Sequence, residues 1–214
     1  MRSRFIKLAI LGISVSALAG CNSKNVTITA DKAKNNEIIV TESGALQGVI
    51  KEEFDKKYYN EKELKAFIKE DIEEFNNENG TKVKLNSMLV KEKNVYVVMD
   101  YKSTDEYNSY GEYNVSYLNA DVAKDSKQVK DKLTVYGKDK TEHKIEALDK
   151  DKKVIIIKEK PSEETPYGDV PAEKKVDLNV TVAGKIKYVS GAKKDDGNTA
   201  KINTLKEPVV IVYE

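Results

Sequence analysis

The clearest hydrophobic pattern in the chain is an apolar stripe within residues 61–76. Its members recur at intervals of three and four residues, as on one face of an amphipathic helix: Leu64, Phe67, Ile68, Ile72 and Phe75. Asn60 and Glu63 stand at the spacing of a capping box, and Tyr59 and Leu64 at that of a hydrophobic staple. Gly80 provides a helix stop. The pattern therefore predicts one main helix over residues 61–76.

Alternating apolar and polar positions predict short β-strands on both sides of this helix. The candidate strands are residues 37–42, 46–54, 81–90, 95–101, 113–117, 132–137, 142–148, 152–159, 176–182, 185–191, 199–205 and 209–214. We expect hairpin turns near Lys93–Asn94 and at Asp196–Gly197. A second capping box, Ser103 with Glu106, predicts a short helix that Gly111 closes. The expected fold is α+β, with the main helix packed on antiparallel sheets and a strand-rich C-terminal half.

Proline marks the best candidate boundary. Pro161, Pro166 and Pro171 cluster within residues 160–174, which reads as a loop. The globular region, residues 37–214, therefore has a candidate subdivision into 37–160 and 175–214. About forty residues are few for an independent core, so we expect the second part to pack on, or extend, the preceding sheet.

The N-terminus has the layout of an export signal. Arg2, Arg4 and Lys7 form a basic head, and the thirteen residues 8–20 carry no charge. A membrane-spanning helix needs about 20 apolar residues, so this run is short for a span. A basic head, a short apolar run and small residues at its end are typical of a signal peptide.

The end of this run holds the only cysteine of the chain. Leu18, Ala19, Gly20 and Cys21 resemble the lipobox of bacterial lipoproteins. The resemblance implies that residues 1–20 are a signal peptide and that the Cys21 thiol receives a diacylglyceryl group. Two acyl chains hold a protein stably on a membrane, and residues 21–36 would form a flexible tether. The alternative is an ordinary signal peptide with a chance cysteine.

Charge is high but balanced, with 37 basic and 36 acidic residues. Without the leader the count is 34 basic against 36 acidic residues, because its three charged residues are all basic. Such a balance argues against a nucleic-acid partner. No arginine follows Arg4, which disfavours specific phosphate binding. The lysine- and asparagine-rich composition favours a low-GC Gram-positive source, which places the protein on the outer face of the cytoplasmic membrane.

Catalytic and metal-binding patterns are weak. His143 is the only histidine, so a triad or a zinc site would depend on it alone. Asp195 and Asp196 suggest calcium only superficially, since a hairpin turn explains them. Acidic residues at 70, 71, 73 and 74 read as a solvated helix face, although a carboxylate hydrolase would also use paired acids. We therefore expect no enzyme activity, no cofactor and no metal.

Tyrosine is the one suggestive excess. Six of the 12 tyrosines fall within 22 residues: Tyr96, Tyr101, Tyr107, Tyr110, Tyr113 and Tyr117. Tyrosine is enriched at binding surfaces, so these six form a candidate binding surface. The alternative is that they fill a core that lacks tryptophan.

Together these patterns predict a membrane-anchored extracytoplasmic lipoprotein that binds an envelope protein, a peptide or a polysaccharide. The part after the leader resembles, in build, small uncharacterised lipoproteins of Gram-positive bacteria, and this resemblance carries no catalytic motif. A structural or accessory subunit of an envelope complex is the main alternative, and a carboxylate hydrolase is the other.

Overall fold

The computed structural model describes residues 26–125, 134–136, 142–144, 148–160 and 175–214. The strands of the larger sheet, sheet A, are β1 Asn36–Val40, β2 Leu46–Glu53, β3 Lys84–Lys91, β4 Asn94–Tyr101, β9 Lys175–Val182, β11 Lys193–Asp196 and β12 Thr199–Thr204. Those of sheet B are β5 Tyr113–Asn119, β6 Thr134–Tyr136, β7 Glu142–Lys144, β8 Lys153–Glu159, β10 Ile186–Ser190 and β13 Val209–Tyr213. The helices among these residues are α1 Glu61–Asn79, α2 Thr104–Tyr110 and α3 Ala120–Asp125.

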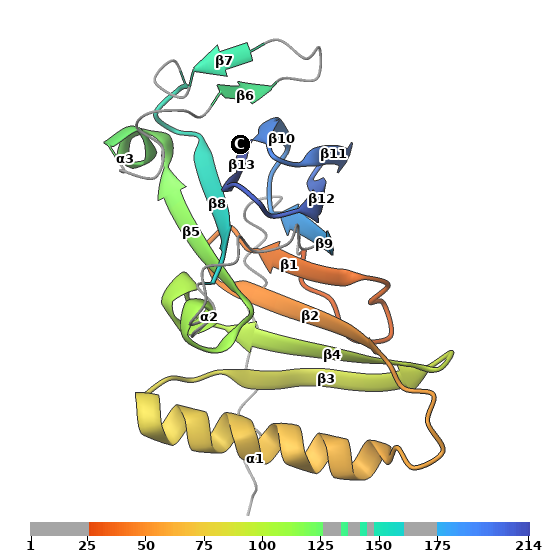
Figure 1. Cartoon of the computed structure of the whole chain (residues 1–214). Helices are drawn as coiled ribbons and strands as arrows, with labels where there is room; N and C mark the ends of the chain where they lie inside the picture. Colours follow the sequence, from red (N-terminus) through yellow and green to blue (C-terminus); the bar gives the residue numbers. More distant parts are fainter. Residues whose placement is uncertain (1–25, 126–133, 137–141, 145–147, 161–174) are drawn as a thin grey trace, which may run out of the picture.

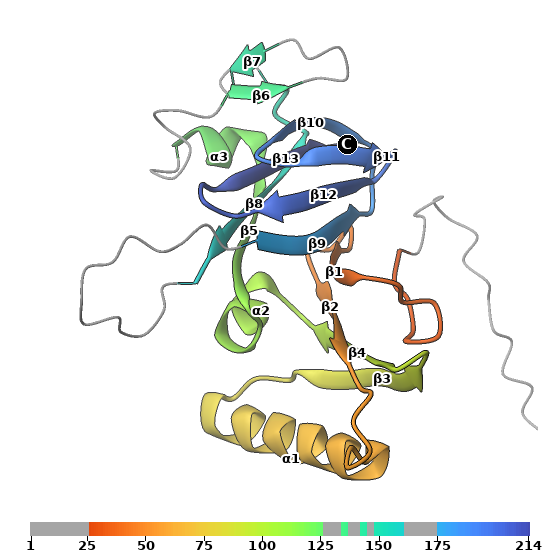
Figure 2. The ribbon, with the colours of Figure 1, turned by 45° about the vertical axis from the view of Figure 1, so that its right-hand side comes forward.

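Sheet A has the strand order β11-β12-β9-β1-β2-β4-β3, and sheet B has the order β5-β8-β13-β10-β6-β7. The strand pairs are antiparallel except β1 with β9, which is parallel. The α+β fold, with one long helix and a strand-rich C-terminal half, is confirmed. Figures 1 and 2 show α1 beside β3, the strand at the edge of sheet A.

Both sheets contribute to one main core. Ile38 and Val180 of sheet A belong to the same cluster of buried residues as Ile155 and Ile211 of sheet B. The continuous apolar run of β13 is buried along its whole length, because the other face of sheet B is covered as well. There, small α3 side chains such as Ala123 pack on the sheet.

The segment before β1 covers the second face of sheet A. Ala30 and Ala33 are buried against Ile39, Val49 and Val98. The Ala30 amide donates to Ser87 Oγ at 2.9 Å. The tether predicted for residues 21–36 is therefore corrected for its described part: residues 26–35 pack on the domain, because Val26, Ile28, Ala30 and Ala33 supply apolar contacts to sheet A. Residues 21–25 lie outside the described part of the chain.

The last forty residues are built into both sheets. Strand β9 lies between β1 and β12, and β13 lies between β8 and β10. The segment therefore extends the preceding sheets, as its small size suggested. Most of the proline-containing segment, residues 161–174, lies outside the described residues.

Helix α1 begins as its sequence predicts. The Asn60 side chain accepts hydrogen bonds from the backbone amides of Lys62 and Glu63, at 3.0 and 3.4 Å. Its amide donates to Glu63 Oε1 at 2.9 Å, which differs from the backbone contact of a standard capping box. The helix ends at Asn79, three residues later than predicted, and Gly80 adopts the left-handed conformation that stops it.

Candidate functional site: a groove beside helix α1

A groove of about 990 Å³ lies between α1, α2 and one face of sheet A. Its lining residues come from β1, β2, β4, β9 and the start of β5, from α1 and α2, and from the loops that connect β2 to α1 and α2 to β5. Helix α1 packs chiefly on β3 at the sheet edge, so it leaves the central strands of this face open to the groove (Figure 1).

The floor of the groove is apolar, and two tyrosine rings lie close over it. Ile38 on β1, Gly48 on β2 and Met99 on β4 stand opposite one another in register. A Cβ at Gly48 would lie 3.3 Å from the ring of Tyr101 and 3.5 Å from that of Tyr107. Because glycine has no side chain, both rings can lie close over β2.

Helix α1 is fixed by its C-terminal half. Ile72 is its only buried residue. The Asn76 side chain donates to the Val83 carbonyl at 2.9 Å and accepts from the Val83 amide at 2.9 Å, as a neighbouring strand would. Phe75 packs edge-on against Tyr110, with ring centroids 4.9 Å apart. The N-terminal half packs on the core through the half-buried Leu64 and Ile68, and this half borders the groove mouth.

Exposed aromatic residues gather at that mouth. Tyr58, Phe67 and Tyr59 are 78%, 66% and 41% exposed and line the groove. Tyr59 stacks on Phe54, with ring centroids 4.8 Å apart, and Tyr58 packs edge-on against Tyr59 at 5.0 Å. Within the described ranges, Val122 on α3 is the only other large apolar side chain that is exposed. Apolar surface is thus concentrated at one place.

The structure does not gather the six tyrosines of the sequence cluster on one surface. Tyr101 and Tyr107 are buried, with ring centroids 5.0 Å apart, and line the groove together with Tyr110 and Tyr113. Tyr96 is buried on the opposite face of sheet A, beneath residues 26–35. A ligand-binding role stays a prediction for the four at the groove.

Tyr117, the sixth member of that cluster, lies away from the groove lining. Its hydroxyl donates to the Glu42 carbonyl at 3.0 Å. A Cβ placed on Gly44 would lie 2.7 Å from its ring. Tyr117 thus packs over the β1–β2 turn and holds that turn to strand β5.

Helix α2 closes one end of the groove. The Tyr110 hydroxyl donates a hydrogen bond to the Asp71 carboxylate on α1. Burial, followed by this hydrogen bond, raises the pKa of Tyr110. Burial and the neighbouring Glu112 raise the pKa of Tyr113 to about 12. Both phenols are therefore neutral hydrogen-bond donors at physiological pH.

The charged groups of the lining are mostly acidic. One lysine, Lys175, accompanies seven carboxylate residues: Glu37, Glu52, Glu53, Glu63, Asp71, Glu112 and Asp177. Asp177 pairs with Lys201, with N and O 2.8 Å apart. Glu37 accepts a hydrogen bond from Thr181, and burial raises its pKa. Within the described part of the chain, the remaining five carboxylates form no salt bridge.

The acidic helix positions singled out in the sequence are exposed, as a solvated helix face would be: Glu70, Asp71, Glu73 and Glu74. Of these, only Asp71 lines the groove. Asp196 ends β11 just before the turn into β12, which confirms the predicted hairpin. His143 lies on β7, but its side chain is outside the described residues. Leu18, Ala19, Gly20 and Cys21 are outside them too.

Among the described residues, no group of three or more His, Cys, Asp or Glu side chains is arranged to hold a metal ion. None of the described helices is both long enough and apolar enough to cross a membrane.

Sequence reasoning missed the aromatic rim. Phe54, Tyr58 and Tyr59 lie in the polar stretch between β2 and α1, where three aromatic side chains among lysines were an available signal. Phe67 was assigned to the apolar stripe of α1, and it lies there, but the stripe is wider than the contact with β3.

Comparison with known proteins gives no relative from which a function could be transferred. No protein-family model, no curated protein and no solved structure matches this chain.

Proposed function

We propose that this chain is a lipid-anchored extracytoplasmic binding module, and that it holds its ligand in the groove beside α1. The anchor rests on the lipobox-like sequence that ends at Cys21. The binding role rests on one observation: the exposed aromatic residues of the described domain gather around an apolar groove.

The exposed apolar surface at the mouth of the groove supports a binding role. Tyr58 and Phe67 together leave large apolar surfaces in water, and such surfaces on soluble domains usually mark interaction sites. Aromatic side chains also dominate the energy of many interfaces. A ligand that enters the groove would cover both side chains and displace water from the buried floor.

An accessory subunit of an envelope complex is the second candidate, since Phe67 and Tyr58 could equally be covered by a partner protein. The two candidate functions differ in which part of the groove the partner contacts. A ligand in the groove reaches its apolar floor, whereas a flat protein interface covers only the rim.

The anchor is tested by replacing Cys21. We expect the C21A variant to leave the membrane fraction and appear in the medium, because the thiol is the only acceptor for the lipid. S23A, which keeps the thiol two residues away, is the control and should remain membrane-bound. A C21A protein that stays in the membrane fraction would overturn the anchor.

The groove is tested with a tryptophan reporter, because the natural chain contains no tryptophan. F67W places one at the mouth, and V122W places one on α3 at a similarly exposed position. With the neutral apolar dye Nile red, we expect energy transfer from the first variant and little from the second. Equal transfer from both reporters would contradict a groove site.

A further inference from the structure

We infer that the ligand of this groove is an extended polypeptide segment that carries both apolar and lysine or arginine side chains. This inference rests on the proposed binding function and specifies its partner. The groove lining is negatively charged. Within the described chain, five of its carboxylates form no salt bridge: Glu52, Glu53, Glu63, Asp71 and Glu112.

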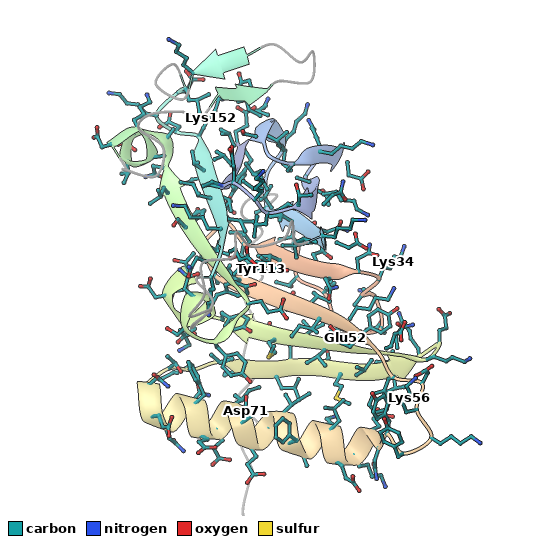
Figure 3. All side chains as sticks on the ribbon, in the orientation of Figure 1. Lys34, Glu52, Lys56, Asp71, Tyr113 and Lys152 are labelled. Atoms are coloured by element: carbon teal, nitrogen blue, oxygen red, sulfur yellow. The ribbon has the colours of Figure 1, made fainter. Side chains whose placement is uncertain are left out.

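These carboxylates come from different walls. Glu52 and Glu53 end strand β2, Glu63 and Asp71 lie on α1, and Glu112 follows α2. Figure 3 shows Glu52 on β2 and Asp71 on α1, on separate elements of the site. An incoming cation therefore meets negative charge from several sides.

Helix α1 carries its lysines and its groove-lining acidic residues on different sides. At 100° per residue, Lys62, Lys65 and Lys69 lie roughly 120–180° around the helix from Asp71. None of these lysines lines the groove, whereas Glu63 and Asp71 do. The helix as a whole is thus mixed in charge, but the side that faces the groove is acidic and apolar.

The spacing of the acids favours a polymer over a small cation. Glu63 and Asp71 are eight residues apart on α1, which corresponds to about 12 Å along the helix. An extended chain advances about 3.3 Å per residue, so basic side chains four positions apart would reach both carboxylates. The apolar residues between them would meet the floor and the aromatic rim. The volume, about 990 Å³, is at the upper end for small-molecule sites.

The test uses three nine-residue peptides of one design. The first is Lys-Leu-Ser-Leu-Lys-Leu-Ser-Leu-Lys, the second replaces each lysine by glutamine, and the third replaces each lysine by glutamate. Binding to the full domain is followed by fluorescence anisotropy of an N-terminal label. We expect the lysine peptide to bind at least tenfold more tightly than the glutamine peptide, and the glutamate peptide to bind weakest. Raising the salt concentration from 50 to 500 mM should shrink the preference, because salt screens the carboxylates.

Two matched double variants test whether the groove carboxylates cause the preference for the lysine peptide. The double variant E52Q/E63Q removes two groove charges and leaves the Tyr110–Asp71 bond intact. The double variant E70Q/E73Q removes two charges from α1 outside the groove lining. We expect the lysine preference to fall to within twofold in the first and to persist in the second.

The outcomes separate the two proposals. Equal binding of the three peptides, or a preference that both double variants keep or both lose, would overturn the cationic ligand. The binding function would survive that result if Nile red still reports the groove through F67W. Failure of the dye and of all three peptides would remove both proposals.

Discussion

The hydroxyl of Tyr110 donates a hydrogen bond to the carboxylate of Asp71, and this bond joins helix α2 to helix α1 at one end of the groove. The same tyrosine ring packs against Phe75, one helical turn further along α1. Together the two contacts hold the long helix from the side, where the sheet does not reach it.

Removing this hydroxyl should loosen the attachment of α1. We expect Y110F to lower the free energy of unfolding by about 1 kcal/mol, the usual net value of one hydrogen bond. Urea denaturation measures the change. Y58F removes an exposed hydroxyl from the same rim and should have an effect close to zero. Equal effects of the two substitutions would show that the Asp71 bond does not stabilise the fold.

Two apolar residues of α1 should differ sharply in their effect on stability. Ile72 is buried, so I72A should cost about 2–4 kcal/mol of unfolding free energy through lost burial and a cavity. Phe67 is mostly exposed, so F67A should change it by less than about 0.5 kcal/mol. Urea denaturation compares the two variants. A large loss in F67A would mean that this side chain serves the core rather than the groove.

Alanine substitutions at two glycines with positive φ distinguish the cost of backbone strain from the cost of a steric clash. Gly80 has φ 65° and open space around it, so G80A should cost about 1 kcal/mol from the left-handed conformation alone. Gly44 has φ 82° and faces the Tyr117 ring, so G44A should cost about 1–3 kcal/mol more. Thermal or urea unfolding of both variants measures the difference. If G44A is no worse than G80A, the Tyr117 ring yields without cost.

Acid should weaken the contacts of Glu214. Hydrogen bonds from Lys152 and Lys187 lower the pKa of this carboxyl to about 2, against an ordinary value of 4.5. Because the pKa is lower in the folded state, the stabilising contribution is present above pH 4.5 and is lost as the pH falls toward 2. Urea midpoints at pH 6, 4 and 3 should fall less steeply in E214Q than in the natural chain. Parallel acid dependence in both proteins would contradict the role of this carboxyl.

Local signals predicted helices α1 and α2 well, because their causes lie within a few residues, whereas the short helix α3 was not predicted. Asn60 caps α1, and Ser103 accepts a hydrogen bond from the Glu106 amide at the start of α2, as their spacing indicates. Even in these helices, the hydrogen-bond partners of the Glu106 side chain depend on tertiary structure. The Glu106 carboxylate accepts from the backbone amides of Lys102 and Lys82 instead of completing its own capping box.

The groove could not be predicted from periodicity, because it depends on where α1 sits. The apolar stripe indicates which side of the helix is sheltered, and Ile72 follows that rule. Phe67 lies on the same stripe but is mostly exposed and lines the groove. Strand alternation places Tyr96 and Tyr101 on opposite faces of β4, but only the fold shows that Tyr101 faces the groove and Tyr96 the segment before β1.

The parallel pairing of β1 with β9 has a consequence for the timing of folding. Thr181 on β9 bonds Glu37 on β1 across 144 positions of sequence. At a synthesis rate of about 5–20 residues per second, the ribosome needs on the order of ten seconds to deliver that partner. During this interval β1 is an open edge, and sheet A cannot close around it. The nascent domain therefore stays unfinished until nearly all of it has been translated.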